Sequence, residues 1–249
     1  MNVVITGVSS GFGHEMAKVF AQAGHTVIGI ARRQDRLTAI RTELGERFQG
    51  FELDVSNRSN AESVVKEIMS QFGHVDILVN NAGLALGLEG AHEANFDDWQ
   101  TMVQTNVLGL ISLTQLFLPY MAKRNEGYVI NMGSIAGNWP YPGGNVYGAT
   151  KAFVKQFSLN LRADLFGKNI RVTNVEPGLC GETEFSNVRF KGDDDKAAAL
   201  YKNAHPVTGK DIADIVFWLA NQPKHININQ IEIMPTSQTF GGLRVHYAE

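Results

Sequence analysis

Short hydrophobic runs alternate with amphipathic stretches along most of the chain. Hydrophobic runs typical of buried strands occupy residues 3–6, 27–30, 51–55, 77–80, 128–132, 171–175 and 231–233. Helical spacing of hydrophobic positions lies between them, around residues 16–23 and over residues 33–44, 61–72, 96–121, 147–166 and 211–220. This order is typical of a parallel sheet joined by crossover helices. We therefore predict an α/β fold, a single doubly wound parallel sheet of about seven strands with helices on both faces.

Two segments depart from this alternation. Residues 99–122 are uncharged and long enough to cross a bilayer, but they contain many amides and hydroxyls that would be costly in lipid. We expect a helix buried in the fold or in a subunit interface. Residues 177–206 show little periodicity and carry an acidic turn, so we expect a substrate-covering lid over residues 178–206. No linker or repeat divides the chain, which predicts a single domain over residues 1–249.

Composition narrows the class of protein. Hydrophobic residues make up 44% of the chain and charged residues 19%, which predicts a folded protein. The net charge of -3 gives no basic footprint for a nucleic-acid partner. Cys180 is the single cysteine, so we expect neither a disulfide nor a metal site, and a reducing cytoplasm fits best. The start of the chain does not look like a secretion signal.

A glycine-rich turn follows the first predicted strand. Residues 6–13 read Thr-Gly-Val-Ser-Ser-Gly-Phe-Gly and lead into a helix. Glycines allow close approach of the backbone to a pyrophosphate, and free amides at a helix N-terminus bind its oxygens. The spacing G-x-x-x-G-x-G differs from the common dinucleotide fingerprint, and a turn that binds nothing is the alternative. The candidate cofactor ligands here are Gly7, Ser9, Ser10, Gly11, Phe12 and Gly13.

The second predicted strand ends in two arginines. Arg32 and Arg33 stand where an NAD enzyme of this architecture places an acidic residue. Guanidinium groups suit a 2'-phosphate, so NADP is favoured over NAD, the alternative being a solvated helix start. Other strand ends on the same side of the sheet could also contact the cofactor. These further candidates are Asp54, Val55, Asn81, Ala82 and Gly83.

Tyr147 and Lys151 stand four residues apart at the start of a predicted helix, and hence on one face of it. A neighbouring ammonium group can lower the pKa of a phenol towards neutrality. Taken alone, however, this pair is more often part of surface packing.

Together these motifs resemble the short-chain dehydrogenase/reductase family. The resemblance rests on residues 6–13 and 80–83, on Asn106, and on Ser134, which lies 13 residues before Tyr147 in the sequence. It covers nearly the whole chain and implies a Rossmann-type sheet, a nicotinamide cofactor and hydride transfer at a carbonyl carbon.

The resemblance also implies roles for individual residues. Tyr147 would be the general acid or base, and Lys151 would hold the nicotinamide ribose and lower the pKa of Tyr147. Ser134 would bind the reacting oxygen, and Asn106 would anchor a water that relays protons to Lys151. The loop that lines the nicotinamide would be formed by Pro177, Gly178, Thr183 and Phe185.

Four stretches are similar to one subgroup of the family, the bacterial NADP-dependent 3-hydroxy acid dehydrogenases. These are residues 80–87, 143–153, 176–178 and 182–190; Cys180 and Gly181 depart from the subgroup. The similarity implies interconversion of serine, L-allo-threonine or 3-hydroxypropionate with the 3-oxo acid or semialdehyde. Such substrates need a cation for their carboxylate. Arg189 is the candidate, with Arg244 and His246 in residues 241–249 as alternatives.

Rival functions remain at this stage. A sulfonate would satisfy the same cation, so a sulfoacetaldehyde or other small aldehyde reductase is the nearest rival. A 3-ketoacyl carrier-protein reductase would favour a basic docking patch, which the sequence does not show. A non-catalytic NADP-binding sensor is the rival of another class. The two long uncharged helices, and the habit of the family, predict a homotetramer.

Overall fold

The computed structural model describes residues 1–181, 183–195, 201 and 204–240. Within them, seven parallel strands form one sheet in the order β3-β2-β1-β4-β5-β6-β7. The strands are β1 (Asn2–Thr6), β2 (Thr26–Ala31), β3 (Phe48–Glu52), β4 (Ile77–Asn80), β5 (Gly127–Met132), β6 (Ile170–Pro177) and β7 (Gln230–Ile233). The predicted doubly wound α/β fold is confirmed.

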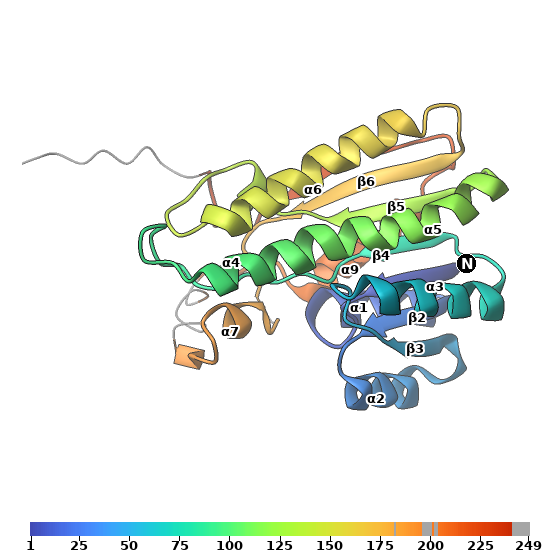
Figure 1. Cartoon of the computed structure of the whole chain (residues 1–249), viewed down its shortest axis with the longest axis horizontal. Helices are drawn as coiled ribbons and strands as arrows, with labels where there is room; N and C mark the ends of the chain where they lie inside the picture. The colour runs from blue at the N-terminus through green and yellow to red at the C-terminus, as the bar shows by residue number, and fades with distance from the viewer. Residues whose placement is uncertain (182, 196–200, 202–203, 241–249) are drawn as a thin grey trace, which may run out of the picture.

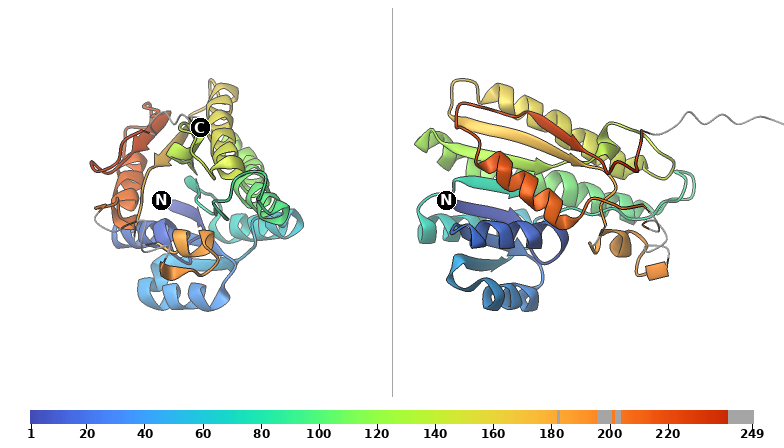
Figure 2. Two further views of the ribbon diagram at one scale, coloured as in Figure 1. Left: turned by 90° about the vertical axis from the view of Figure 1, so that its left-hand side faces the viewer. Right: turned by 180° about the vertical axis from the view of Figure 1, so that it is seen from behind.

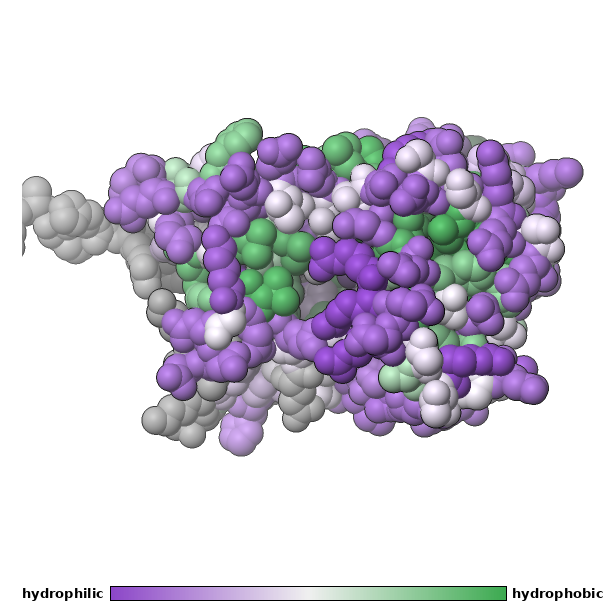
Figure 3. Space-filling model, turned by 60° about the horizontal axis from the view of Figure 1, so that its bottom comes forward, coloured by the Kyte–Doolittle hydropathy of each residue, from purple (hydrophilic) through white to green (hydrophobic). Residues whose placement is uncertain are grey.

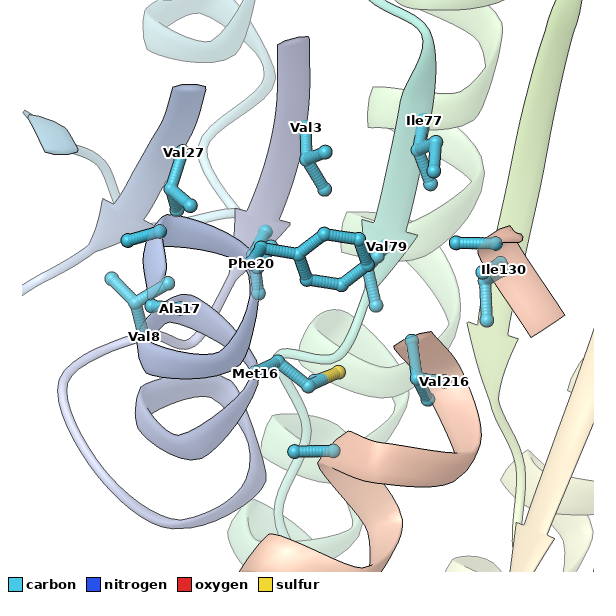
Figure 4. Close-up of a cluster of buried hydrophobic side chains, with 14 of the residues drawn as sticks. Val3, Val8, Met16, Ala17, Phe20, Val27, Ile77, Val79, Ile130 and Val216 are labelled. Carbon is cyan, nitrogen blue, oxygen red and sulfur yellow. The ribbon is translucent and has the colours of Figure 1, made fainter. Parts of the chain in front are cut away.

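Helices cover both faces of the sheet (Figures 1 and 2). One face carries α1 (Gly11–Gln22), α2 (Gln34–Leu44) and α9 (Gly209–Ala220), and the other carries α3 (Arg58–Phe72), α5 (Leu110–Arg124) and α6 (Asn145–Asp164). Strand side chains alternate between the two hydrophobic cores, so that Val3 faces α1 and Val4 faces α3 and α5. Figure 4 shows Met16 and Phe20 of α1 packed between β1, β4 and Val216 of α9.

The predicted helix over residues 96–121 is three helical segments in continuous succession. They are α4 (Phe96–Val103), a π-helix (Gln104–Gly109) and α5. Among the described residues, the stretch Phe96–Arg124 is the one helix long and apolar enough to cross a membrane. Leu113, Phe117 and Met121 of this stretch are buried in the core, which accounts for its hydrophobic character. The face shown in Figure 3 is mostly hydrophilic, with hydrophobic side chains in separate patches.

Several predicted boundaries were wrong. Strand β3 begins at Phe48, not at residue 51, because the Phe48 ring fills the space above Gly29 on the neighbouring strand. Asp54 and Val55 therefore follow the strand and do not end it. Helix α3 begins earlier than predicted, because the Asn57 side chain caps it by accepting from the Asn60 amide.

The segment predicted to be irregular contains a short helix, α7 (Phe185–Arg189). A β-bridge between Cys180 and Val207 joins the two ends of this segment. Residues 182, 196–200 and 202–203 of the predicted lid lie outside the described residues.

Candidate active site

The carboxyl ends of the strands meet at the end of the sheet that faces away from the N-terminus, where α7 also lies (Figure 1). The strand order reverses between β1 and β4, which carry Thr6 and Asn80 at their ends. In open α/β sheets, ligands bind at such a switch point. The predicted cofactor and catalytic residues converge on this edge.

The glycine-rich turn is fixed in place by its neighbours. The Thr6 hydroxyl accepts from the amides of Asn81 and Ala82 at 2.9 and 2.8 Å, and the Asn81 side chain donates to the Thr6 carbonyl at 2.8 Å. Glycine is required at Gly13, where an added Cβ would lie 2.3 Å from the Gly7 carbonyl oxygen. The Asn81 side chain thus holds the turn against β4.

The N-terminus of α1 suits a diphosphate. Its N-cap, Ser10, makes no capping hydrogen bond with its side chain, and the first turn has no acidic residue. Backbone amides at a helix N-terminus bind anions, and the helix dipole favours them. Thr183 packs against this end of the helix, because a Cβ added to Gly11 would lie 3.3 Å from the Thr183 Cβ. The turn therefore fits a dinucleotide.

Arg33 lies beside the turn. Its Nε and Nη2 atoms donate to the Ser9 hydroxyl at 3.3 and 3.0 Å, and Nη2 also donates to Glu184 at 3.0 Å. Arg32 is exposed at the end of β2. Both arginines are at the edge where a 2'-phosphate is expected, which fits NADP.

Asp54 and Val55, both predicted to contact the cofactor, differ in exposure. Asp54 is exposed and accepts from the amide and hydroxyl of Ser56 at 2.9 and 2.7 Å. Val55 is buried, and a Cβ added to Gly109 would lie 2.7 Å from its Cγ2. The Val55 side chain therefore packs on the π-helix, and contact with an adenine would fall to its backbone.

Tyr147 and Ser134 come together at the end of β5. A hydrogen bond joins their side chains, while the Ser134 hydroxyl donates to the Pro177 carbonyl at 3.4 Å and accepts from the Ala136 amide at 3.1 Å. Burial raises the pKa of Tyr147 above its ordinary value, opposite to the lowering expected from Lys151, and only the bond to Ser134 and the charge of Arg189 oppose that rise. The phenol therefore keeps its proton at neutral pH.

Lys151 and Asn106 are each held by hydrogen bonds to the backbone. The Lys151 ammonium donates to the Met132 carbonyl at 2.8 Å, and burial lowers its pKa to about 8. Asn106 is on the π-helix, where its side chain accepts from the Leu84 amide at 2.9 Å and donates to the Leu84 carbonyl at 2.8 Å. Asn106 therefore lies where the helix departs from α-helical geometry.

The predicted nicotinamide loop continues from β6 into α7. The amide of Gly178 donates to the Ile233 carbonyl at 2.7 Å, which ties the loop to β7. The Phe185 ring lies 5.7 Å from the Tyr147 ring, measured between centroids. The segment after β6 therefore brings Phe185 against Tyr147.

Arg189 lies over the same tyrosine. Its Cζ atom is 5.6 Å from the centroid of the Tyr147 ring. The guanidinium donates to the Tyr141 hydroxyl at 2.8 Å and to the Gly87 carbonyl at 3.2 Å. The alternative cations, Arg244 and His246, lie outside the described residues.

Three residues of this site escaped the sequence analysis. Tyr141 orients Arg189, Glu184 binds Arg33, and the Gln238 side chain accepts from the Leu179 amide at 2.7 Å beneath the nicotinamide loop. Tyr141 stands in a Pro- and Gly-rich turn just before Tyr147, a signal that could have drawn attention to it. Glu184 lies within residues 182–190, which carry the resemblance, but nothing local pairs it with Arg33, and no local pattern marks Gln238.

Comparisons with known proteins agree with this geometry. Residues 1–194 match the short chain dehydrogenase family. The NADP-dependent 3-hydroxy acid dehydrogenase of Salmonella typhi is 55% identical, and the alignment covers 99% of each chain. The serine 3-dehydrogenase of Agrobacterium fabrum is 49% identical over 98% of this chain and 97% of its own.

A solved structure of serine dehydrogenase in its closed form, complexed with NADP+, superposes with a TM-score of 0.98. It is 52% identical in sequence, and the match covers 100% of both chains. The chain therefore belongs to the short-chain dehydrogenase family of enzymes.

Proposed function

We propose that the protein is an NADP-dependent dehydrogenase that interconverts small 3-hydroxy acids with their 3-oxo acids or semialdehydes. The observation that carries this proposal is the guanidinium of Arg189 over the ring of Tyr147, because it combines a cation for a carboxylate with an acid/base group. The names of the relatives at 49 to 55% identity point to the same chemistry.

NADP is the proposed cofactor. The end of β2 offers Arg32 and Arg33 where NAD enzymes carry a carboxylate, and Arg33 is held beside Ser9 of the glycine-rich turn. A guanidinium group binds a phosphate through paired hydrogen bonds. The bound nicotinamide would supply or accept the hydride.

Tyr147 performs the proton transfer in this proposal. In reduction, its phenol proton passes to the substrate oxygen as the carbonyl becomes an alcohol, and in oxidation the phenolate takes the proton back. The raised pKa of Tyr147 keeps the proton available for reduction at neutral pH. Ser134 would turn its hydroxyl proton from the Pro177 carbonyl to the same oxygen, where negative charge develops.

Lys151 and Asn106 complete the proton path. Lys151 holds the nicotinamide ribose, and its pKa of about 8 allows it to exchange protons near neutral pH. Asn106 fixes the backbone at Leu84, next to Gly83, and a relaying water would pass here between Asn106 and Lys151.

Arg189 is proposed to bind the substrate carboxylate. Its contacts with Tyr141 and the Gly87 carbonyl fix the direction of the guanidinium. Residues 178–206 would cover the substrate as a lid, since α7 carries both Arg189 and Phe185. We also propose that the protein is a cytoplasmic homotetramer.

Kinetics of Arg189→Ala test the substrate assignment. We expect the KM for malonic semialdehyde to rise about tenfold or more, with little effect on propanal, because truncating a charge-pairing residue costs about 2 kcal/mol or more. Lys191→Ala is the matched control, since Lys191 is nearby on the chain but pairs with Asp98 at 2.8 Å. Equal effects of Arg189→Ala on both aldehydes would remove the assignment.

Sulfoacetaldehyde tests the nearest rival, because a sulfonate would pair with the same guanidinium. Efficient reduction of sulfoacetaldehyde with no turnover of 3-oxo acids would replace the proposed substrate class while keeping the mechanism. NADPH binding without turnover of any aldehyde would favour a sensor.

A further inference from the structure

The arginine proposed to bind the 2'-phosphate already binds a carboxylate. Arg33 Nη2 donates to Glu184 Oε2 at 3.0 Å, and the side chains are 40% and 44% exposed. The same nitrogen donates to the hydroxyl and the carbonyl of Ser9, at 3.0 and 3.3 Å. Glu184 and Ser9 therefore accept hydrogen bonds from the same nitrogen of Arg33, beside the glycine-rich turn.

Glu184 comes from a distant part of the chain. It is 151 residues from Arg33 and just precedes α7, next to Thr183, which packs on Gly11 at the start of α1. Burial opposes ionisation of Glu184, but Arg33, Ser10 and Arg36 hold its pKa below the ordinary value. The Glu184 carboxylate therefore lies beside Arg33, the residue predicted to bind the 2'-phosphate.

We propose that Glu184 competes with the 2'-phosphate of the cofactor for Arg33 and so sets the affinity and selectivity for NADP. This inference rests on the proposed function, because it takes Arg33 to be a ligand of that phosphate. An anion beside a guanidinium weakens the electrostatic attraction of that guanidinium for a second anion. A cofactor without a 2'-phosphate does not compete.

Titration calorimetry with 2',5'-ADP and 5'-AMP tests the proposal on the full chain without catalysis. These probes differ by one phosphate. Glu184→Gln removes the charge and keeps the shape, so we expect 2',5'-ADP to bind about two- to fivefold more tightly and 5'-AMP to bind as before, the size expected of an exposed ion pair. The gain should shrink at high salt.

Asp194→Asn is the matched control. It removes the same charge from the same segment, but Asp194 accepts from Asn187 at 2.6 Å and not from Arg33. We expect this variant to bind both probes like the wild type. Tighter binding of 2',5'-ADP to Asp194→Asn by the same factor would show a general charge effect and would overturn the role of Glu184.

The remaining outcomes separate this inference from the proposed function. Wild-type protein that does not distinguish the two probes would contradict the choice of NADP, and the inference would fall with it. If the wild type prefers 2',5'-ADP, unchanged or weaker binding of that probe to Glu184→Gln would overturn the inference alone. Arg33→Ala should reduce the preference, with Arg32 still present, and should remove the effect of Glu184→Gln.

Discussion

Gly83 follows β4 and lies beside two polar side chains, those of Asn106 and Lys151. A Cβ added there would lie 3.1 Å from Asn106 Oδ1 and 3.5 Å from Lys151 Nζ, and the backbone of Gly83 is not left-handed. An alanine at this position is therefore tolerated by the backbone but fills the path proposed for the relaying water. We therefore expect Gly83 to matter because it places no side chain in that path.

We predict that Gly83→Ala lowers kcat by about tenfold or more, while the melting temperature stays within a few degrees of the wild type, since proton-transfer effects are about 100- to 10,000-fold when complete. Steady-state kinetics with NADPH and calorimetry measure the two quantities. An unchanged kcat would contradict the water path at this position.

Residue-level prediction from the sequence worked where the spacing is local. Tyr147 and Lys151 are one helical turn apart, so a helix brings them to one face whatever the rest of the chain does. The contacts of Arg33 with Glu184 and of Arg189 with Tyr141 join segments far apart in the sequence. Periodicity carries no information about such pairs.

At the scale of elements, the close approach of α1 to β1 depends on one glycine. A Cβ added to Gly13 would lie 2.3 Å from the Gly7 carbonyl oxygen and 2.8 Å from Asn81 Nδ2. The first of these atoms belongs to the backbone and cannot rotate away. Helix α1 would have to move off the turn.

Gly13→Ala should therefore lower the free energy of unfolding by about 1 to 3 kcal/mol, as overpacking does, and should weaken NADPH binding. Gly209→Ala is the control. Its Cβ would lie 3.3 Å from the flexible Glu15 side chain and 3.8 Å from Gly11 and Phe12, an ordinary contact distance, so we expect a change within about 0.5 kcal/mol. Denaturant titration measures the free energy of unfolding of both variants. Equal stability of the two variants would refute the packing argument.

Most elements could be predicted from hydrophobic periodicity, but three features could not. The start of β3 depends on Phe48 packing above Gly29, a contact between strands. The π-helix around Asn106 has the same hydrophobic pattern as an α-helix. Helix α7 has only five residues, of which Phe185 packs on Tyr147 while Val188 is exposed, so it is too short to show a hydrophobic period.

The molecule as a whole leaves apolar surface on α5 and α6. Between these helices lies a groove of about 560 Å³ whose lining includes Leu118, Pro119 and Phe157, and Leu159 is 38% exposed on α6. Apolar patches on a folded chain are typical of interaction surfaces. This surface is where we expect the subunits of the proposed homotetramer to meet.

Light scattering should give the mass of a tetramer at micromolar concentration. Leu159→Glu places a charge in the proposed interface and should shift the mass towards a dimer or monomer, whereas Thr42→Glu on exposed α2 should not. A wild-type protein that is monomeric at micromolar concentration would contradict the proposed assembly.

The most direct test of the proposed function is absorbance at 340 nm with purified protein and 3-hydroxypropionate, L-serine or L-allo-threonine, with NADP or NAD. We predict reduction of NADP by these 3-hydroxy acids, slower reduction of NAD, and a loss of about 1,000-fold in Tyr147→Phe, which keeps the ring and removes the proton donor. Turnover by Tyr147→Phe at the wild-type rate, or no turnover of any 3-hydroxy acid by the wild type, would contradict the proposal.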